Sequence, residues 1–155
     1  MNEQKTGPAE STLDEKGRVN IPIRFRDQYQ GELVISRGMD PCIWIMTPSV
    51  WETIKQDIKK TGEYSAEEWM ALEEAFFCQA QQVELDKIGR VAVPSVLRKY
   101  ANLSKECVVI STGDRLSIWD SDTYGAYIKE KNAVIRAALN KIGRQNIFKS
   151  EGDGV

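Results

Sequence analysis

Residues 13–26, LDEKGRVNIPIRFR, decide how this chain folds, because residues 85–98, LDKIGRVAVPSVLR, repeat them. Seven of the fourteen aligned positions are identical: leucine, aspartate, glycine, arginine, valine, proline and the closing arginine. Ile21 against Val93 also keeps an apolar side chain. A repeat this dense indicates that the chain is built from two copies of one structural unit.

In the first copy, a short polar turn separates two stretches of strand-like sequence. Apolar and polar residues alternate on both sides of the turn, which predicts a tight β-hairpin. Gly17 is expected to take a positive φ, with Lys16 near the tip. Asp14 and Arg18 flank the turn and are close enough in sequence to form an ion pair.

After the hairpin, Pro22 suits the first turn of a short helix over residues 23–29, closed by Gly31. Residues 33–35 then correspond to residues 108–110 and predict an apolar strand in each copy. A glycine turn follows in both copies, and a tryptophan comes six residues after each glycine. This spacing aligns Trp44 with Trp119.

A helical insert is expected between the two copies. Thr47 and Pro48 provide an N-cap and a first-turn proline, and Ser65 with Glu68 forms the pattern of a capping box. The insert also carries a stripe of aromatic side chains at helical spacing. Such a stripe could line a ligand pocket, but core packing is the commoner arrangement. The residues expected to face inward are Val50, Ile54, Ile58, Trp69, Leu72 and Phe76.

These elements predict an α+β fold: two units of β-hairpin, short helix and β-hairpin, joined by the insert and followed by a C-terminal helix. We expect unit 1 in residues 8–50, the insert in 51–79, unit 2 in 80–123, and the C-terminal helix and tail in 124–155. A unit of about 40 residues rarely buries enough surface to fold alone. We therefore expect the two copies, or two chains, to interleave their hairpins.

Composition limits the compartment and the functional class. Cys42, Cys78 and Cys107 lie far apart in apolar runs, which favours free buried thiols in a reducing compartment over disulfides or a metal site. The polar N-terminus, expected as a loose tail up to Ser11, does not resemble a signal peptide. No apolar run is long enough for a membrane span. We expect a cytoplasmic protein with a loose tail from Gly143.

Charge is distributed unevenly, although the 155-residue chain has a formal net charge of only −2. Residues 13–26 contain four basic and two acidic side chains, and residues 85–99 contain four basic and one acidic. Residues 48–78 contain three lysines and seven carboxylates. Basic charge concentrated on the repeated unit is what a nucleic-acid surface on an acidic protein would show, and solvated arginines on short helices are an equal alternative.

The residue types argue against an enzyme. The chain contains no histidine, which excludes Ser-His-Asp and Cys-His catalytic systems and imidazole metal sites. Neither a GxxxxGK[ST] loop nor a GxGxxG fingerprint occurs. The repeated aspartates each precede an arginine by four residues, so an ion pair that fixes the turn explains them better than acid–base chemistry. No catalytic residue, metal, cofactor or small-molecule substrate is expected.

The paired Leu-Asp-x-x-Gly-Arg-x-x-x-Pro-x-x-x-Arg units, together with residues 35–44 and 112–119, resemble the MraZ family of bacterial transcriptional regulators, which is related to the AbrB and SpoVT proteins. The resemblance covers the chain from about Ser11 to Ile128. It implies the swapped-hairpin AbrB fold with two units per chain and a ring-like homo-oligomer larger than a dimer. It also implies binding to repeated double-stranded DNA boxes upstream of the division and cell-wall gene cluster, and hence association with the nucleoid.

The family's Asp-x-x-x-Arg signature falls on Asp14 with Arg18 and on Asp86 with Arg90. An arginine fork suits phosphate or a guanine edge, and a lysine at a turn suits phosphate. The residues expected to shape the turns are Asp14, Gly17, Asp86 and Gly89. The residues expected to contact DNA are Lys16, Arg18, Arg24, Arg26, Lys87, Arg90 and Arg98.

Alternatives remain open at this point. For Arg26 and Arg98, a salt bridge to a neighbouring acid is as plausible as DNA contact, and Ile88 stands where the family usually has a polar turn residue. An oligomeric scaffold would use the same hairpins for protein partners, with a binding surface on the acidic insert. A toxin-paired repressor usually has one unit and a toxin-binding tail, whereas this chain has two units.

Overall fold

The computed structural model describes residues 7–143. In chain order its elements are β1 (Ala9–Thr12), β2 (Arg18–Asn20), α1 (Ile23–Arg26), β3 (Leu33–Arg37), β4 (Ile43–Met46), α2 (Pro48–Thr61), α3 (Ala66–Ala71), the π-helical η2 (Leu72–Phe77), β5 (Gln81–Val83), β6 (Arg90–Ala92), α4 (Ser95–Ala101), β7 (Glu106–Ser111), β8 (Leu116–Asp120) and α5 (Ser121–Lys141). The predicted N-terminal tail is wrong in its last residues, because β1 already begins at Ala9. The tail predicted from Gly143 lies outside the described residues except for Gly143 itself.

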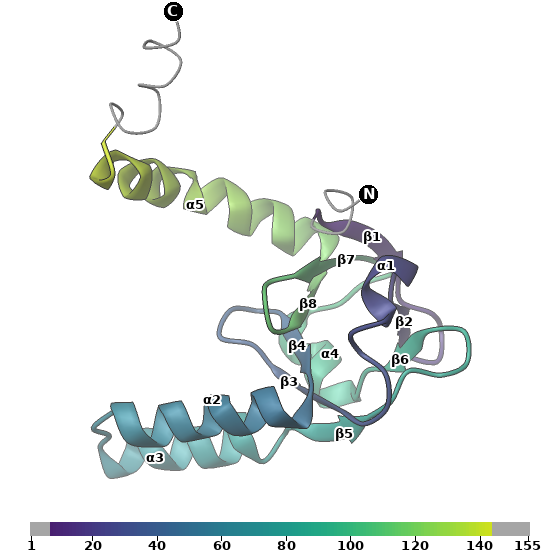
Figure 1. Cartoon of the computed structure of the whole chain (residues 1–155), viewed down its shortest axis with the longest axis horizontal. Helices are drawn as coiled ribbons and strands as arrows, with labels where there is room; N and C mark the ends of the chain where they lie inside the picture. The colour runs from purple at the N-terminus through teal and green to yellow at the C-terminus, as the bar shows by residue number, and fades with distance from the viewer. Residues whose placement is uncertain (1–6, 144–155) are drawn as a thin grey trace, which may run out of the picture. The chain divides into compact units, whose positions relative to one another are not determined.

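The strands form two sheets that the two units share. The large sheet has the order β1-β7-β8-β4-β3-β5, and the small sheet pairs β2 with β6. At one edge β1 of the first unit pairs with β7 of the second, and at the other edge β5 of the second unit pairs with β3 of the first. Figure 1 shows β1 beside β7 and β2 beside β6. This interleaving confirms the α+β architecture expected from the repeat.

Within each unit, the predicted first hairpin is reduced to little more than its turn. An isolated bridge between Leu13 and Val19 joins the two sides of the first turn. Beyond it, β1 enters the large sheet, whereas β2 pairs with β6 in the small sheet. The hairpin prediction is therefore wrong beyond the turn, because the flanking strands have their partners in the other unit.

Strand register also corrects the alignment of the two copies. Strand β3 pairs with β5, and β7 pairs with β1, which is the equivalent of β5 in the first copy. In these pairings Ile35 takes the same position as Val109, whereas the sequence alignment matches it with residue 110. In the next strands Trp44 takes the position of Ser117, so its predicted equivalence with Trp119 is wrong. One residue of this two-residue displacement is already present in the preceding strands, and the other comes from loop length: the β3–β4 loop is one residue longer than the β7–β8 loop.

The main core lies between the large sheet and a second layer made of the small sheet, α1 and α4. The sheet contributes Leu33, Ile35, Ile43, Ile45, Cys107, Val109, Leu116 and Ile118. The second layer contributes Val19, Ile21, Phe25, Tyr29, Val91, Val93, Leu97 and Ala101. A proline stands at the N-cap of each short helix, and α1 ends at Arg26, earlier than the predicted residue 29.

The helical insert carries the predicted caps. Thr47 caps α2, and Ser65 with Glu68 forms a reciprocal capping box at the start of α3. Phe76 stacks on Trp51, with 5.7 Å between the ring centroids. The aromatic side chains of the insert thus pack against one another, as core packing predicted.

Two of the three cysteines are buried as predicted. Burial raises the pKa of Cys42 to about 12 and that of Cys107 to about 11, so both stay protonated at neutral pH. Cys78 is exposed, so the prediction is wrong for this residue, which follows η2 at the end of the insert. All three are free thiols.

The predicted C-terminal helix is present as α5. Independently of its two repeats, the chain divides into two compact bodies, with the boundary between Ser121 and Asp122. The finer four-segment division stays a prediction. Of the helices in residues 7–143, none combines the length and apolar character needed to cross a membrane.

Candidate nucleic-acid interface

The two-stranded ribbon of β2 and β6 carries the centre of the predicted basic site. Its register places Val19 opposite Val91, and both side chains are fully buried in the core. Because side chains alternate along a strand, the residues on either side of these valines face outward. They are Arg18 opposite Ala92, and Asn20 opposite Arg90.

Asp14 holds the first turn and Arg18 together. Its Oδ1 accepts the backbone N–H groups of Lys16 and Arg18, both at 2.9 Å, and its Oδ2 accepts the Arg18 Nε–H at 2.7 Å. Gly17 completes the turn with a φ of +80°, which L side chains rarely adopt. One carboxylate therefore fixes both the turn and the base of the arginine side chain.

The second turn reproduces this arrangement. Asp86 Oδ1 accepts the backbone N–H groups of Ile88 (3.1 Å) and Arg90 (2.8 Å), and Oδ2 accepts the Arg90 Nε–H at 2.7 Å. Gly89 has a φ of +87°. The predicted aspartate–arginine ion pairs are thus confirmed in both copies, while the DNA contacts stay predictions.

Both arginines keep their terminal amino groups available. Their Nε atoms are bound by the aspartates, and within residues 7–143 no hydrogen bond engages their Nη atoms. The side chains of Arg18 and Arg90 are 27% and 29% exposed. Each arginine is therefore fixed at its base and presents a planar pair of donors at its end.

The pKa of both aspartates lies below its ordinary value. For Asp14 the backbone N–H of Arg18 lowers the pKa most, partly opposed by burial, and the Arg18 side chain and the Lys16 N–H lower it further. Arg90 and Ile88 act on the pKa of Asp86 in the same order. Both carboxylates are therefore charged at neutral pH.

Acid is expected to destabilise the protein through these two groups. A carboxyl whose folded pKa lies below its unfolded value, here 3.8, contributes stability that is complete above that value and is lost as the pH falls through the folded pKa. Asp14→Asn combined with Asp86→Asn should flatten the fall in melting temperature as the pH is lowered below about 5. A fall equally steep in the variant and the parent would contradict this assignment.

Arg26 and Arg98 brace the ribbon across the two units. Each donates to a backbone carbonyl five residues earlier in its own unit, at 2.6 Å and 2.5 Å respectively. A Cβ added to Gly17 would overlap Arg98 Nη1, and one added to Gly89 would overlap Arg26 Nε. Each arginine therefore lies against the turn of the other unit. The alternative of a salt bridge to a neighbouring acid is wrong for both, because carbonyl oxygens take these donors.

A family model described as "MraZ protein, putative antitoxin-like" matches residues 6–74 and again residues 76–144, so each match contains one braced turn. The chain belongs to the MraZ family. The "Transcriptional regulator MraZ" of Treponema denticola is 35% identical over 140 residues, which cover 89% of this chain and 96% of that protein.

The remaining predicted DNA-contacting residues differ in how free they are. Lys16 and Lys87 are exposed in the two turns of the MraZ repeats. Arg24 is engaged, because its Nη2 donates to the backbone carbonyls of residues 7 and 8 at 2.8 Å and 3.2 Å. The structure thus brings Lys16, Arg18, Lys87 and Arg90 to the ribbon and its turns, and ties Arg24 to the N-terminal segment.

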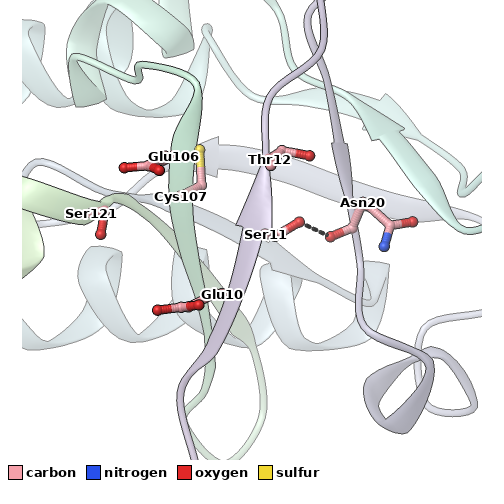
Figure 2. Close-up of a pocket in the computed structure, with 7 residues that line it drawn as sticks. All are labelled: Glu10, Ser11, Thr12, Asn20, Glu106, Cys107 and Ser121. Atoms are coloured by element: carbon pink, nitrogen blue, oxygen red, sulfur yellow. Dashed lines mark hydrogen bonds between the residues drawn. The ribbon is translucent and has the colours of Figure 1, made fainter.

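An acidic depression of about 420 Å³ lies beside the ribbon. Figure 2 shows the carboxylates of Glu10 and Glu106 projecting to the same side of the β1–β7 pair, with Asn20 on the neighbouring strand. Ser11 Oγ–H donates to the Asn20 carbonyl at 2.5 Å. Two carboxylates repel phosphate, so this depression limits the basic site of the MraZ fold on that flank. Over residues 7–143, no three His, Cys, Asp or Glu side chains gather as a metal site would require.

Asn20 was not among the site residues predicted from the sequence. It is exposed on the outward face of the ribbon, and its Oδ1 accepts the Arg26 Nη2–H at 3.2 Å. The aligned residue of the second MraZ repeat is Ala92. The alignment of the copies shows that asparagine and alanine differ at this position. Only the pairing of β2 with β6 shows that both residues lie on the outward face of one ribbon.

Proposed function

We propose that this chain is a sequence-specific DNA-binding transcriptional regulator whose reading element is the β2–β6 ribbon. The observation that carries the proposal is the pair of aspartate-braced arginines, Arg18 and Arg90, one from each repeat and both on the outward face. The name of the Treponema denticola relative, a transcriptional regulator, supports it. Because the target is chromosomal DNA, we place the protein in the cytoplasm, at the nucleoid.

A two-stranded ribbon fits the major groove of B-form DNA. With Nε held by an aspartate, the two Nη atoms of each arginine are left to donate parallel hydrogen bonds to O6 and N7 of a guanine. The aspartate stays behind its arginine, since the DNA phosphates repel its charge. The carboxylate therefore improves DNA reading by orienting the arginine before binding, which lowers the entropy lost on contact.

The other basic residues contribute either to the affinity for DNA or to the geometry of the ribbon. Lys16 and Lys87 are exposed at the turns, where a flexible ammonium group neutralises phosphate without fixing the base sequence. Arg24 reaches the flanking backbone only if it leaves the carbonyls it now binds. Arg26 and Arg98 hold the two turns against the ribbon, so they set the spacing of Arg18 and Arg90.

One ribbon makes few phosphate contacts, so a single chain should bind weakly and with strong salt dependence. We propose that the chain assembles into a ring-like homo-oligomer and binds direct repeats upstream of the division and cell-wall gene cluster. The ring gives neighbouring ribbons a high effective concentration at neighbouring boxes.

Several correctly phased boxes are expected to bind at least about 100-fold more tightly than one box. Electrophoretic mobility shifts with the DNA immediately upstream of the protein's own gene, cut to one box or left with all of them, measure this directly. Inserting about half a helical turn, roughly five base pairs, between boxes is the matched control, because it rotates one box away from its ribbon. Equal affinity for one box and for several would contradict the oligomeric mechanism.

The same assay separates this function from that of a protein-binding scaffold. A scaffold would give no salt-sensitive DNA shift and would bind its partner through the acidic insert. Its test variant replaces exposed or half-buried carboxylates of α3 and η2, namely Glu67, Glu68, Glu73 and Glu74. Loss of partner binding in that variant, with no DNA shift in the parent, would overturn the proposed function.

A further inference from the structure

We infer that Asn20 reads a base and thereby sets the direction in which the ribbon lies on each box. This inference rests on the proposed function. The Val19–Val91 pair marks an approximate two-fold axis at the centre of the ribbon, which exchanges Arg18 with Arg90. The same axis exchanges Asn20 with Ala92, so the two halves of the reading face are unequal.

The two exchanged residues differ in what they offer a base. An asparagine amide pairs with adenine through two hydrogen bonds, in which Oδ1 accepts from N6 and Nδ2 donates to N7. The methyl group of Ala92 forms no hydrogen bond and suits only apolar contact. Register places Asn20 opposite Arg90 and Ala92 opposite Arg18, and both Asn20 and Ala92 are exposed. One half of the ribbon therefore carries an arginine and an amide, and the other an arginine and a methyl group.

Arg26 prepares Asn20 for this role. Its Nη2–H donates to Asn20 Oδ1 at 3.2 Å, which fixes the orientation of the amide. The amide oxygen keeps a second lone pair that can accept from adenine N6, and the same hydrogen bond fixes where the amide Nδ2 lies. The corresponding Arg98 has no such partner, because alanine stands at the equivalent position. Arg26 is thus a positioning residue in one half only.

The turn tips add to the difference between the halves. Lys16 occupies the first turn, and the aligned Ile88 occupies the second, where its side chain is 57% exposed. Glu15 offsets the charge of Lys16 in the first turn, whereas Lys87 stands beside Ile88 in the second, so the turn next to Arg90 is the more positive of the two. We therefore expect guanine at both ends of the box, with an adenine requirement at the Arg90 end alone.

Asn20→Ala and Ala92→Asn test the base preference. Fluorescence anisotropy with upstream duplexes carrying every single base-pair change gives the affinity of each variant for each position. The parent should lose affinity about tenfold when the adenine pair at one end is replaced. Asn20→Ala should bind the original duplex and the duplex with the replaced adenine pair equally. Ala92→Asn should acquire a second adenine requirement at the other end of the box. An unchanged preference in both variants would overturn the inference.

Exposed Cys78 allows the direction to be read separately. It is the exposed thiol among the three cysteines and lies just before β5, at one edge of the large sheet. A DNA-cleaving iron chelate attached to it should cut the parent's duplex on one side of each box. Asn20→Ala should cut on both sides, while Arg136→Ala, which removes an exposed charge on α5, should keep one side.

The outcomes distinguish the inference from the function on which it rests. If the parent binds none of the upstream DNA, the proposed function and the inference both fail. If the parent binds and cuts on one side, and Asn20→Ala does the same, only the inference fails. Far-ultraviolet circular dichroism of each variant establishes that the ribbon is still folded.

Discussion

Replacing Arg18 by alanine is expected to abolish specific binding to the operator, so that only weak, sequence-independent binding remains. Each bidentate contact of an arginine with guanine contributes about 1–3 kcal/mol of discrimination. In an oligomer bound to several boxes this loss recurs at every box, so the total exceeds what a single ribbon would lose. The fold should remain, because the Arg18 side chain lies on the outward face of the ribbon and Asp14 still accepts the backbone N–H groups of its turn.

Arg136→Ala is the matched control, since it removes the same charge from an exposed position on α5. Anisotropy at several salt concentrations separates the two effects: Arg18→Ala should remove sequence preference, whereas a phosphate-contacting variant such as Lys16→Ala should lower the salt slope. Melting temperatures establish that the variants are folded. Normal operator binding by Arg18→Ala would show that the first turn does not read DNA.

Gly17→Ala is expected to destabilise the fold by about 2.5–5 kcal/mol. At a φ of +80° an L side chain costs about 1–2 kcal/mol. The new Cβ would also displace Arg98, whose Nη1 it would overlap and which donates to the Val93 carbonyl. A charge-assisted hydrogen bond of this kind contributes about 1.5–3 kcal/mol.

Gly31→Ala is the control for Gly17→Ala, because Gly31 has a similar φ of +73° but nothing within 4 Å of the added Cβ. It should cost only about 1–2 kcal/mol, the backbone contribution alone. Urea unfolding at one fixed protein concentration gives both values. In the Arg98→Ala background, Gly17→Ala should cost no more than Gly31→Ala. Equal costs for the two glycine variants in the parent background would show that the Arg98 brace contributes nothing.

Local signals are enough to predict the turns and the caps. Asp14 and Arg18 are four residues apart and meet across one turn, so their pairing needs no information from the rest of the chain. The capping box at Ser65 is equally local. Strand partners are a different matter, because β1 and β2 each pair with the other unit, and nothing within residues 9–20 specifies which strand they meet.

The errors at the candidate site follow the same division. Charge alone suggests acidic partners for Arg26 and Arg98, but their donors go to carbonyls and their guanidinium groups lie against turns some 70 residues away in sequence. Spacing alone aligns Trp44 with Trp119, although two loops differ by one residue. The sequence does not single out Asn20, because its neighbour across the ribbon, Arg90, belongs to the other repeat.

The joining of both repeats in one polypeptide has a consequence for how a two-stranded ribbon of this kind evolves. A dimer made from one short gene product must place the same side chain on both sides of its axis, so any change that helps one flank is imposed on the other. Covalent linkage removes that constraint, and it also makes the pairing of the halves independent of dilution. Substitutions can then accumulate on one flank alone, as the asparagine and alanine at ribbon positions 20 and 92 already illustrate.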